Sequence, residues 1–283
     1  MTTQTIALTG ATGHLGRLAL AALKTRAPQA NVIALARDAK ADLGVPVRAF
    51  DYTKPDTLAP ALQGVDVLVL ISSNDFNDRV GQHRAVIHAA KAAGVGRIVY
   101  TSILKGDASP LLLAADHIAT EAALRESGIP YTLLRNGWYT ENYTGSLAAS
   151  VAHGPMIGSS GEGRIASAAR ADYAEAIAVV ASTAGHDGQI YELAGDVAHK
   201  MAEMAAEVSR QTGKDIPYTS LPADVYAGIL MGFGLPEGFA AVLADSDVKA
   251  SQDGLLDESR TLSRLIGRPT TPIAATIAAA LAV

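Results

Sequence analysis

The chain contains no cysteine among its 283 residues. It can therefore form no disulfide, thiol nucleophile, thiolate zinc site or iron–sulfur cluster. Charged residues are also scarce, at 18% of the chain, and the formal net charge is -5 with no block of Lys and Arg. This charge pattern argues against a nucleic-acid backbone as partner. The expected partner is a small molecule, and any electron carrier has to be bound from outside.

Long apolar runs are absent as well. The apolar tail "PIAATIAAALAV" is far shorter than the roughly 20 residues that cross a bilayer. We expect a last helix that packs on its own domain or on a second subunit, so a homodimer stays open. The amino-terminal "MTTQTIALTG" has neither the basic start nor the apolar stretch of a secretion signal. These features predict a cytoplasmic protein without membrane contact.

Short runs rich in Val, Ile and Leu alternate with Ala-rich stretches of helical period. This alternation is typical of a parallel sheet covered on both faces, and it predicts an α/β fold with a doubly wound (Rossmann) sheet. Two of the expected helices are "HLGRLALAALKTRA" and "GQHRAVIHAAKAAG", the latter ended by Gly94. The expected strands are "TIALTG", "NVIALAR", "VRAFD", "DVLVLISS", "RIVYTS", "YTLLRN" and, further along the chain, "YELAGD".

The pattern changes after about residue 140. The segment "LPADVYAGILMGFGLPEGFAAVLAD" is typical of a helix, a turn and a second helix, separated by Gly and Pro. We expect a dinucleotide-binding domain over 1–140 and 160–196. A smaller, mostly helical substrate-binding lobe should comprise 141–159 and 197–283.

The segment "TGATGHLG" follows the first expected strand and opens the first expected helix. Its glycines, Gly10, Gly13 and Gly16, allow a tight turn and let a pyrophosphate approach the backbone. The helix amino terminus adds unpaired N–H groups and the positive end of a dipole. The spacing is that of the short-chain dehydrogenases, and it predicts a dinucleotide site.

Arg37 ends the second expected strand about 20 residues beyond the glycines, where a side chain meets the 2' position of the adenosine ribose. An acid there binds the hydroxyl of NAD, whereas an arginine offers a planar, charged fork to the 2'-phosphate of NADP. We therefore expect NADPH. Two alternatives stay open: Asp38 could turn inward and accept the hydroxyl, or Arg37 could be a plain surface cation.

Further residues should line the cofactor because they end strands at the carboxyl edge of the sheet, where ligands of open sheets lie. Asp51 is placed to meet the adenine, although an acid there could equally cap the next turn. The other expected wall residues are Tyr52, Ile71, Ser72, Thr101 and Ser102.

The catalytic pair of typical short-chain dehydrogenases, a tyrosine and a lysine four residues later on one helix face, is missing. None of the nine tyrosines has a lysine four residues on. Tyr131 and Arg135 have the spacing, but "YTLLRN" is an expected strand. The helix after the fifth strand reads "LLLAADHIATEAAL" instead, with His117 and Glu121 one turn apart.

With these residues the chain resembles the NmrA-like group of atypical short-chain dehydrogenases. Within that group it is most similar to NADPH-dependent quinone reductases, with triphenylmethane dye reductases as near relatives. The similarity extends over nearly the whole chain, and "LLRNGWYTENY" with the carboxyl-terminal block is far more specific than the glycine motif. It is carried by "TGATGHLG", "TSILKGDASPL", "DHIATE", "YTLLRNGWYTENY", "GRIASAARADYA", "YELAGD", "LADSDVKAS" and "LSRLIGRPTT".

The resemblance implies that His117 occupies the place of the lysine and Leu113 that of the tyrosine. It implies an NADPH site at Gly10, Thr12, Gly13, His14, Leu15, Gly16 and Arg37, and a nicotinamide neighbourhood at Ser72, His117, Asn136, Trp138 and Tyr139. One departure is that the stretch between Arg37 and Asp51 is shorter than usual, which puts the length of the second helix in question.

Quinone chemistry fits a site without the tyrosine. Hydride addition to a quinone gives a phenolate-like anion whose conjugate acid has a pKa of roughly 10, so water or a weak donor completes the reaction. Such a site can act by proximity and orientation while the cofactor supplies the hydride. His117 and Tyr139 are the candidate catalytic residues, and Trp138, Tyr139, Asn142, Met231 and Phe233 the candidate substrate contacts.

Each of these residues has a plainer interpretation. His117 could be a ribose or helix-surface partner, Trp138 and Tyr139 could be packing between lobes, and Asn136 and Asn142 could cap backbone. "MGFGLP" at 231–236 is either a flap over the substrate or a turn in the core. His83 and His88 lack the spacing of metal ligands and are expected to be structural or exposed, so no metal site is expected.

The favoured hypothesis is an NADPH-dependent quinone reductase with its substrate in a cleft between the sheet's carboxyl edge and the helical lobe. Triarylmethane and azo dyes are also flat, conjugated hydride acceptors and remain alternatives. A protein of another class, which senses NADP(H) without turnover, is a further alternative. A serine hydrolase is excluded because no GxSxG segment occurs.

Overall fold

The computed structural model describes residues 3–75 and 77–282. Contacts between Cα atoms divide the chain into two compact units. The first unit comprises 1–107, 115–136 and 170–192, and the second comprises 108–114, 137–169 and 193–283.

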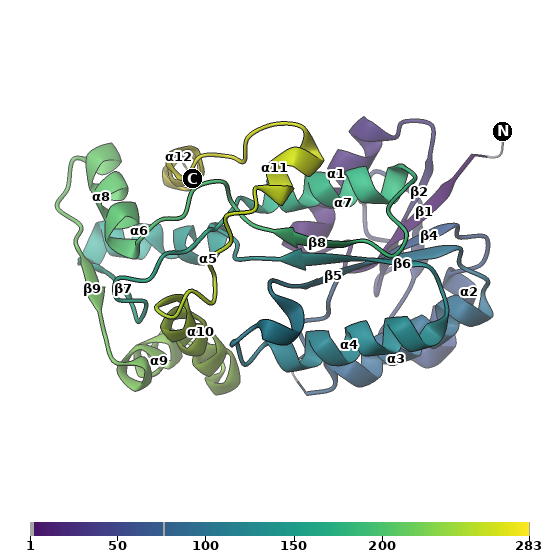
Figure 1. Cartoon of the computed structure of the whole chain (residues 1–283), viewed down its shortest axis with the longest axis horizontal. Helices are drawn as coiled ribbons and strands as arrows, with labels where there is room; N and C mark the ends of the chain where they lie inside the picture. The colour runs from purple at the N-terminus through teal and green to yellow at the C-terminus, as the bar shows by residue number, and fades with distance from the viewer. Residues whose placement is uncertain (1–2, 76, 283) are drawn as a thin grey trace. The chain divides into compact units, whose positions relative to one another are not determined.

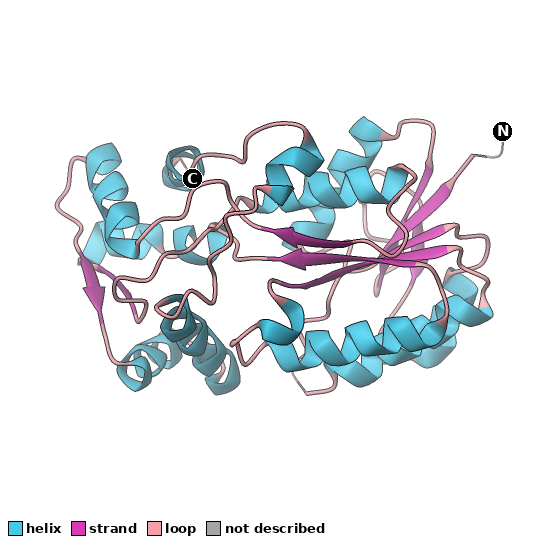
Figure 2. Ribbon diagram, viewed as in Figure 1, coloured by secondary structure: helices cyan, strands magenta, loops and turns pink. Residues whose placement is uncertain are grey.

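The first unit is built on a seven-stranded sheet (Figures 1 and 2). Every registered pair among the first six of its strands is parallel. The strands follow one another across the sheet as β3 (Val47–Ala49), β2 (Asn31–Ala36), β1 (Thr5–Leu8), β4 (Val67–Leu70), β5 (Arg97–Ile103), β6 (Tyr131–Asn136) and β8 (Ile190–Leu193).

Helices cover both faces of this sheet. Figure 1 shows α1 (His14–Arg26) and α7 (Arg170–Ser182) together on one face, and α2 (Leu58–Ala61), α3 (Arg79–Ala92) and α4 (Ala114–Ser127) on the other. Short 3-10 turns, η1 (Pro55–Thr57) and η2 (Gly106–Ala108), join some of these elements. The central strands β1, β4 and β5 are buried on both faces, which explains why they are continuous apolar runs rather than alternating ones.

The core on the α3 side is a single cluster in which helix and strand side chains meet. Ile87 of α3 and Leu124 of α4 pack with Leu68 of β4 and Leu133 of β6, and all four are at most 1% exposed. Burying an aliphatic side chain of this size contributes about 1.5–3 kcal/mol. This packing fixes the carboxyl ends of β4 and β5 against α3 and α4.

The order of the strands changes direction between β1 and β4. The chain proceeds from β1 outward to β2 and β3, then crosses back to β4 on the other side of β1. In open parallel sheets, ligands bind at the carboxyl edge beside such a switch point. The loops that follow β1 and β4 are therefore the first place to look for a site.

The second unit is mostly helical, and it also contains a small sheet that the sequence did not lead us to expect. In that sheet β7 (Met156–Gly158) and β9 (Tyr218–Ser220) run parallel. The last helix packs against α8 and α5, so the expectation of packing on its own domain is confirmed. The helices are α5 (Glu141–Thr144), α6 (Leu147–His153), α8 (Met201–Thr212), α9 (Ala223–Gly232), α10 (Glu237–Ala250), α11 (Thr261–Ile266) and α12 (Ile273–Leu281).

The expected doubly wound α/β fold is confirmed, and each expected strand is present with small differences at its ends. Gly94 follows α3 with a φ of +73°, as expected of a helix stop. No helix lies between β2 and β3, which resolves the question raised by the short stretch after Arg37. The division by contacts assigns 108–114, 137–140, 160–169 and 193–196 to the second unit, and our sequence boundaries for the two domains stay a proposal. Among the described residues, no helix has the length and apolar character to span a membrane.

Candidate functional site

The loop after β1 is shaped by its glycines. Gly10 adopts a φ of +61°, a conformation that is unfavourable for residues other than glycine. A Cβ at Gly16 would collide with the carbonyl oxygen of Gly10 and lie 2.8 Å from the Cα of Ala11. Gly13 is less constrained, since its Cβ would lie 3.3 Å from the same carbonyl. The close packing of loop against helix therefore depends most on Gly16.

The amino terminus of α1 offers unused hydrogen-bond donors. The first backbone bond into the helix is from Arg17 N to Gly13 O, at 3.0 Å, so the N–H groups of His14, Leu15 and Gly16 have no intrahelical acceptor. The N-cap residue, Gly13, has no capping side chain, and the first turn contains no acid. These N–H groups and the helix dipole favour an anion at this position.

Arg37 immediately follows β2 and is exposed. Within the residues that the structure describes, its guanidinium forms no ion pair. Asp38 does not turn inward: it is exposed, and its Oδ1 accepts a hydrogen bond from Lys40 N at 2.9 Å. The arrangement leaves the planar cation of Arg37 available to a phosphate at the end of β2.

Asp51 and Tyr52 lie just after β3 and form different kinds of contact. Oδ1 of Asp51 accepts hydrogen bonds from Thr53 N at 3.0 Å and Thr53 Oγ1 at 2.8 Å. These bonds from Thr53 are the main reason that the pKa of Asp51 lies below its ordinary value. The capping alternative thus describes what Asp51 does within the fold, and contact with adenine stays a prediction.

Tyr52 joins the loops at the switch point. Its hydroxyl donates to Ile71 O at 2.8 Å and lies 2.7 Å from Thr9 Oγ1, which in turn accepts from Ile71 N at 2.9 Å. Burial raises the pKa of Tyr52, so the hydroxyl stays protonated. The ends of β1, β3 and β4 are therefore held together by one set of polar contacts.

The ends of β4, β5 and β6 bring more of the predicted residues together. Ser72 N donates to Thr101 Oγ1 at 2.9 Å. Ser102 Oγ donates to Glu121 Oε1 at 2.6 Å, and its contact with a cofactor stays a prediction. Asn136 ends β6, is 5% exposed, and its carbonyl accepts from Leu104 N at 2.9 Å.

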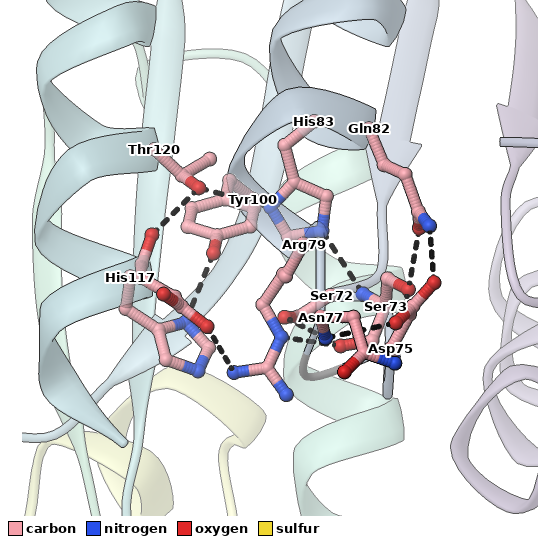
Figure 3. A network of polar contacts seen from close by, with 11 residues as sticks. Ser72, Ser73, Asp75, Asn77, Arg79, Gln82, His83, Tyr100, His117 and Thr120 are labelled. Carbon is pink, nitrogen blue, oxygen red and sulfur yellow. Dashed lines mark hydrogen bonds and ion pairs between the residues drawn. The ribbon is translucent and has the colours of Figure 1, made fainter. Parts of the chain in front are cut away.

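The loop after β4 is held by three side chains from the first turns of α3. Arg79 Nε donates to Ser73 O at 2.6 Å, Ser73 N donates to His83 Nε2 at 2.9 Å, and Ser73 Oγ donates to Gln82 Oε1 at 2.9 Å. Gln82 Nε2 also donates to Asp75 Oδ2 at 2.6 Å. Figure 3 shows these groups converging on the loop. All three polar groups of Ser73 are thus bonded, which makes this wall of the site rigid.

The protonation of His83 follows from its partners. Nε2 accepts the backbone N–H of Ser73, so the ring proton lies on Nδ1, which donates to Thr120 Oγ1 at 2.9 Å. Thr120 Oγ1 donates in turn to Asp116 O at 2.8 Å. Burial and the charge of Arg79 lower the pKa of His83 to about 3. His83 is therefore a neutral structural link between the loop and α4, as the structural interpretation expected, whereas His88 is exposed.

His117 is the predicted site residue with the most informative surroundings. It is 7% exposed, and its Nδ1 lies 2.9 Å from the hydroxyl of Tyr100. Burial raises the pKa of Tyr100, so the hydroxyl keeps its proton and donates it to Nδ1. The imidazole proton is then on Nε2, which has no hydrogen-bond partner in the part of the chain that the structure describes. Figure 3 shows this nitrogen on the side of the ring turned away from Tyr100, with no dashed line to it.

The charge of His117 is also fixed by its surroundings. Burial first, and then the charge of Arg79, lower the pKa of His117 to about 3. The imidazole is therefore neutral at physiological pH. It can donate a hydrogen bond from Nε2, but it is not a cation like the lysine whose place the family resemblance assigns to it.

Glu121, one turn after His117, is completely buried and fully paired. Arg135 contacts it twice, at 2.9 Å from Nε and 2.7 Å from Nη2, and Arg125 contacts it at 2.9 Å. Burial alone would raise the pKa of Glu121, but the hydrogen bonds from Arg135 and Ser102 and the two arginine charges lower it overall. This cluster ties α4 to β5 and β6, and thereby holds the helix that carries His117.

Three of the predicted substrate residues follow β6 in the second unit. Trp138 is 7% exposed, and its carbonyl accepts from Ala168 N at 3.1 Å. Tyr139 forms a single parallel bridge with Ala168, and its carbonyl accepts from Asn142 N at 3.0 Å. Asn142 is exposed within α5. Their contacts with a substrate stay predictions.

Met231 and Phe233 lie at the end of α9 and are 43% and 72% exposed. The interpretation of 231–236 as a turn in the core is therefore wrong. Gly234, with a φ of +88°, ends the helix and lets the chain turn toward α10. The exposed alternative, a segment that covers a substrate, stays a prediction.

The sequence analysis missed Arg79, Gln82 and Tyr100. A signal was present, since Arg79, Gln82 and His83 have the i, i+3 and i+4 spacing of one helix face directed at the loop before them. The polar role of Tyr100 could not be predicted, because an aromatic residue inside an apolar strand usually only packs in the hydrophobic core.

Comparisons with known proteins agree with this geometry. A model of the NmrA-like family matches residues 2–263. The chain is 52% identical over 277 residues, 96% of its own length and 97% of the relative's, to quinone oxidoreductase 2 of Escherichia coli (strain K12).

Two solved structures are also similar. The NADPH complex of the NADPH-dependent quinone oxidoreductase from Escherichia coli superposes with a TM-score of 0.93 at 51% identity, covering 98% of this chain and 99% of that one. The triphenylmethane reductase of Citrobacter sp. superposes with a TM-score of 0.92 at 34% identity, covering 99% and 100%. On this evidence the chain belongs to the NmrA-like family.

Proposed function

We propose that this protein is an NADPH-dependent quinone reductase that transfers a hydride without a tyrosine and lysine pair. The observation that carries the proposal is the open helix end beside the switch point, with Arg37 after β2, in a chain 52% identical to a quinone oxidoreductase. The reaction reduces the quinone by two electrons and oxidises NADPH to NADP⁺.

The residues present fit the cofactor. Gly10 and Gly16 permit a turn that no side chain obstructs, and the N–H groups at the start of α1 are not used by the helix. Arg37 provides a charge for the 2'-phosphate. When bound, NADPH supplies the hydride. The proposed cofactor contacts are Gly10, Thr12, Gly13, His14, Leu15, Gly16, Arg37, Asp51, Tyr52, Ile71, Ser72, Thr101, Ser102, His117 and Asn136.

In this proposal His117 acts as a hydrogen-bond donor and does not change its protonation state. Its Nε2–H donates a hydrogen bond to a quinone oxygen, where negative charge develops as hydride arrives at the ring. Because the phenolate that forms is a weak base with a conjugate acid of pKa roughly 10, water supplies the final proton. Tyr139 is a second candidate donor, and Trp138, Asn142, Met231 and Phe233 complete the proposed substrate contacts.

A dye reductase is the second candidate, favoured by the similarity to triphenylmethane reductase at 34% identity over 99% of the chain. The same chain residues serve either acceptor, because both are flat and conjugated. Relative turnover of a quinone and a triarylmethane dye under one set of conditions decides between them.

The experiment follows NADPH oxidation by purified protein with a simple benzoquinone, after subtraction of the uncatalysed rate. NADH is compared in parallel, together with Arg37→Ala and the control Arg84→Ala, an exposed arginine on α3. Hydrogen bonds to a charged group contribute about 1.5–3 kcal/mol, so Arg37→Ala should raise the KM for NADPH about 10- to 100-fold and leave that for NADH unchanged.

Two results would overturn the proposal. If NADPH binds but neither quinone nor dye accelerates its oxidation, the protein is a nucleotide sensor and not a reductase. If Arg37→Ala behaves like Arg84→Ala, the phosphate contact lies elsewhere.

The setting of the activity is proposed on the same basis. A reaction that consumes NADPH belongs in the cytoplasm, where that cofactor is regenerated. We propose a dinucleotide-binding domain over 1–140 and 160–196 and a substrate-binding lobe over 141–159 and 197–283.

The oligomeric state is a separate question. Sedimentation of the purified protein will distinguish a monomer from a homodimer.

A further inference from the structure

A buried cation lies beside the two neutral histidines of the network in Figure 3. Arg79 is 4% exposed although it is the first residue of α3. Its contacts include Ser73 O, 2.6 Å from Nε, and Asp116 Oδ2, 3.3 Å from Nη1. An arginine keeps its charge in nearly any environment, so a full positive charge is held at this end of the network.

The acid that forms an ion pair with Arg79 is much more exposed to water than the guanidinium is. The side chain of Asp116 is 36% exposed against 4% for Arg79, and water therefore screens the carboxylate more than the guanidinium. Asp75 lies on the loop, where it is partly exposed and bonded to Gln82. Glu121, the buried acid on α4, is already paired with Arg135 and Arg125.

The two histidines report a positive potential in the space between α3 and α4. The charge of Arg79 contributes to the lowered pKa of both His83 and His117, after the larger effect of burial. Both rings are hydrogen-bonded in their neutral forms, through Ser73 N and Thr120 for His83 and through Tyr100 for His117. Because both histidines stay neutral, neither of them changes the positive potential of Arg79 by gaining or losing a proton.

Nε2 of His117 lies at the same end of the network as the guanidinium of Arg79. Figure 3 shows the outward-directed nitrogen of His117 and the guanidinium of Arg79 together at the end remote from Thr120 and Gln82. A ligand oxygen that accepts the hydrogen bond of Nε2–H would feel the field of Arg79 through a poorly solvated region.

We propose that Arg79 is the electrostatic positioning residue of the site, which stabilises the anion formed on a quinone bound at His117 Nε2. The inference rests on the proposed function. Hydride, with its two electrons, adds to the neutral quinone, NADPH becomes NADP⁺, and the negative charge on the quinone oxygen is stabilised until a proton arrives from water.

The test uses 4-nitrophenol as a probe, because it is inert to NADPH and its phenolate has its own visible absorbance. The probe is titrated from acid to alkaline pH while bound to the wild-type protein saturated with NADP⁺. The expected result is a bound pKa lower than that of free 4-nitrophenol by about one unit or more, equivalent to about tenfold preference for the anion.

The variants separate charge from packing. Arg79→Lys and Arg79→Gln both lose the Nε bond to Ser73, but only the second loses the charge. Arg79→Gln should return the probe pKa to its free value and lower kcat for quinone reduction about tenfold, whereas Arg79→Lys should retain most of both. Arg84→Gln, the exposed arginine of the same helix, should match the wild-type protein.

Three outcomes would overturn the inference. The first is an unshifted probe pKa in the wild-type protein, which needs no variant to fold. The second is equal behaviour of Arg79→Lys and Arg79→Gln, which would show a purely structural role. The third is an Arg79→Gln protein that binds NADP⁺ more tightly relative to NADPH with the probe unchanged, which would show that the charge faces the nicotinamide. Absence of turnover with any quinone would refute the proposed function instead, because the probe reports binding alone.

Discussion

Asp247 on α10 is a buried carboxyl whose ionisation should make the second unit less stable as the pH rises. Asp247 is 3% exposed, and its oxygens accept hydrogen bonds from Tyr143 Oη at 3.2 Å and Ser159 N at 2.8 Å. Burial raises its pKa from the ordinary 3.8 to about 6, although both hydrogen bonds oppose the shift. The folded protein therefore holds this proton more tightly than the unfolded chain does.

The sign and size of the effect follow from linkage. A raised pKa in the folded state contributes stability that is complete below the unfolded value of 3.8 and is lost as the pH rises through about 6. The shift of about two units corresponds to about 3 kcal/mol, of which about 2 kcal/mol is lost between about pH 4.5 and about pH 7.5. Asp247→Asn removes this titration, so the free energy of unfolding of the wild type relative to the variant should fall by that amount.

The assay is denaturant unfolding monitored by Trp138, the single tryptophan, which lies buried in the second unit. Asp247→Asn also disturbs one of the two hydrogen bonds, which shifts the whole difference curve but not its slope with pH. Asp224→Asn, which replaces an exposed carboxylate on α9, is the matched control. A flat difference for Asp247→Asn would refute the assignment of a raised pKa to this carboxyl.

Three further predictions concern the first unit. Gly16→Ala should lower NADPH affinity in a fluorescence titration at least about tenfold, because its Cβ collides with the Gly10 carbonyl, and it should do so more than Gly13→Ala, whose Cβ has 3.3 Å of space; equal losses would contradict this. Glu121→Gln should lower the free energy of unfolding by about 3 kcal/mol, since it leaves Arg135 without its main buried partner, and a melting curve unchanged from the wild type would refute a structural role. Because burial and the charge of Arg79 lower the pKa of His117 to about 3, kcat/KM for the quinone should show no ionisation of this residue between about pH 5 and 9, and an inflection near 6.5 that His117→Gln removes would contradict its neutrality.

The strands and the nucleotide loop could be predicted from sequence because each follows from a local rule. A run such as "NVIALA" is apolar at nearly every position only because both faces of β2 are covered, and the loop requires glycine at a φ of +61°. The turn between α9 and α10 was predicted from the same kind of signal, the Gly and Pro residues between the two helical stretches.

The polar interior could not be predicted in the same way. Arg79, Gln82 and Asp247 are residue types that usually lie at the surface, and their burial depends on partners such as Ser73 and Ser159 that are distant or unremarkable in the sequence. For Asp51 the sequence left two roles open, and the structure shows the capping one, in which the carboxylate accepts hydrogen bonds from Thr53. For the segment around Phe233 the sequence offered a flap over the substrate or a turn in the core, and only the observed exposure of Phe233 ruled out the core turn.

If His117 takes the place of the lysine of typical short-chain dehydrogenases, as the resemblance implies, the proposed site keeps its positive charge on another residue. A lysine on α4 would be a mobile cation, whereas His117 is held neutral by burial and by the charge of Arg79, and its Nδ1 is bonded to the hydroxyl of Tyr100. The cation is instead Arg79, which comes from α3 and is fixed by Ser73 and Asp116. A neutral donor supported by a fixed buried charge suits an acceptor whose reduced form is a weakly basic anion, because that anion needs stabilisation more than it needs an acid. This separation of hydrogen bonding from charge predicts that the two substitutions affect different quantities: His117→Gln should weaken quinone binding, and Arg79→Gln should lower kcat.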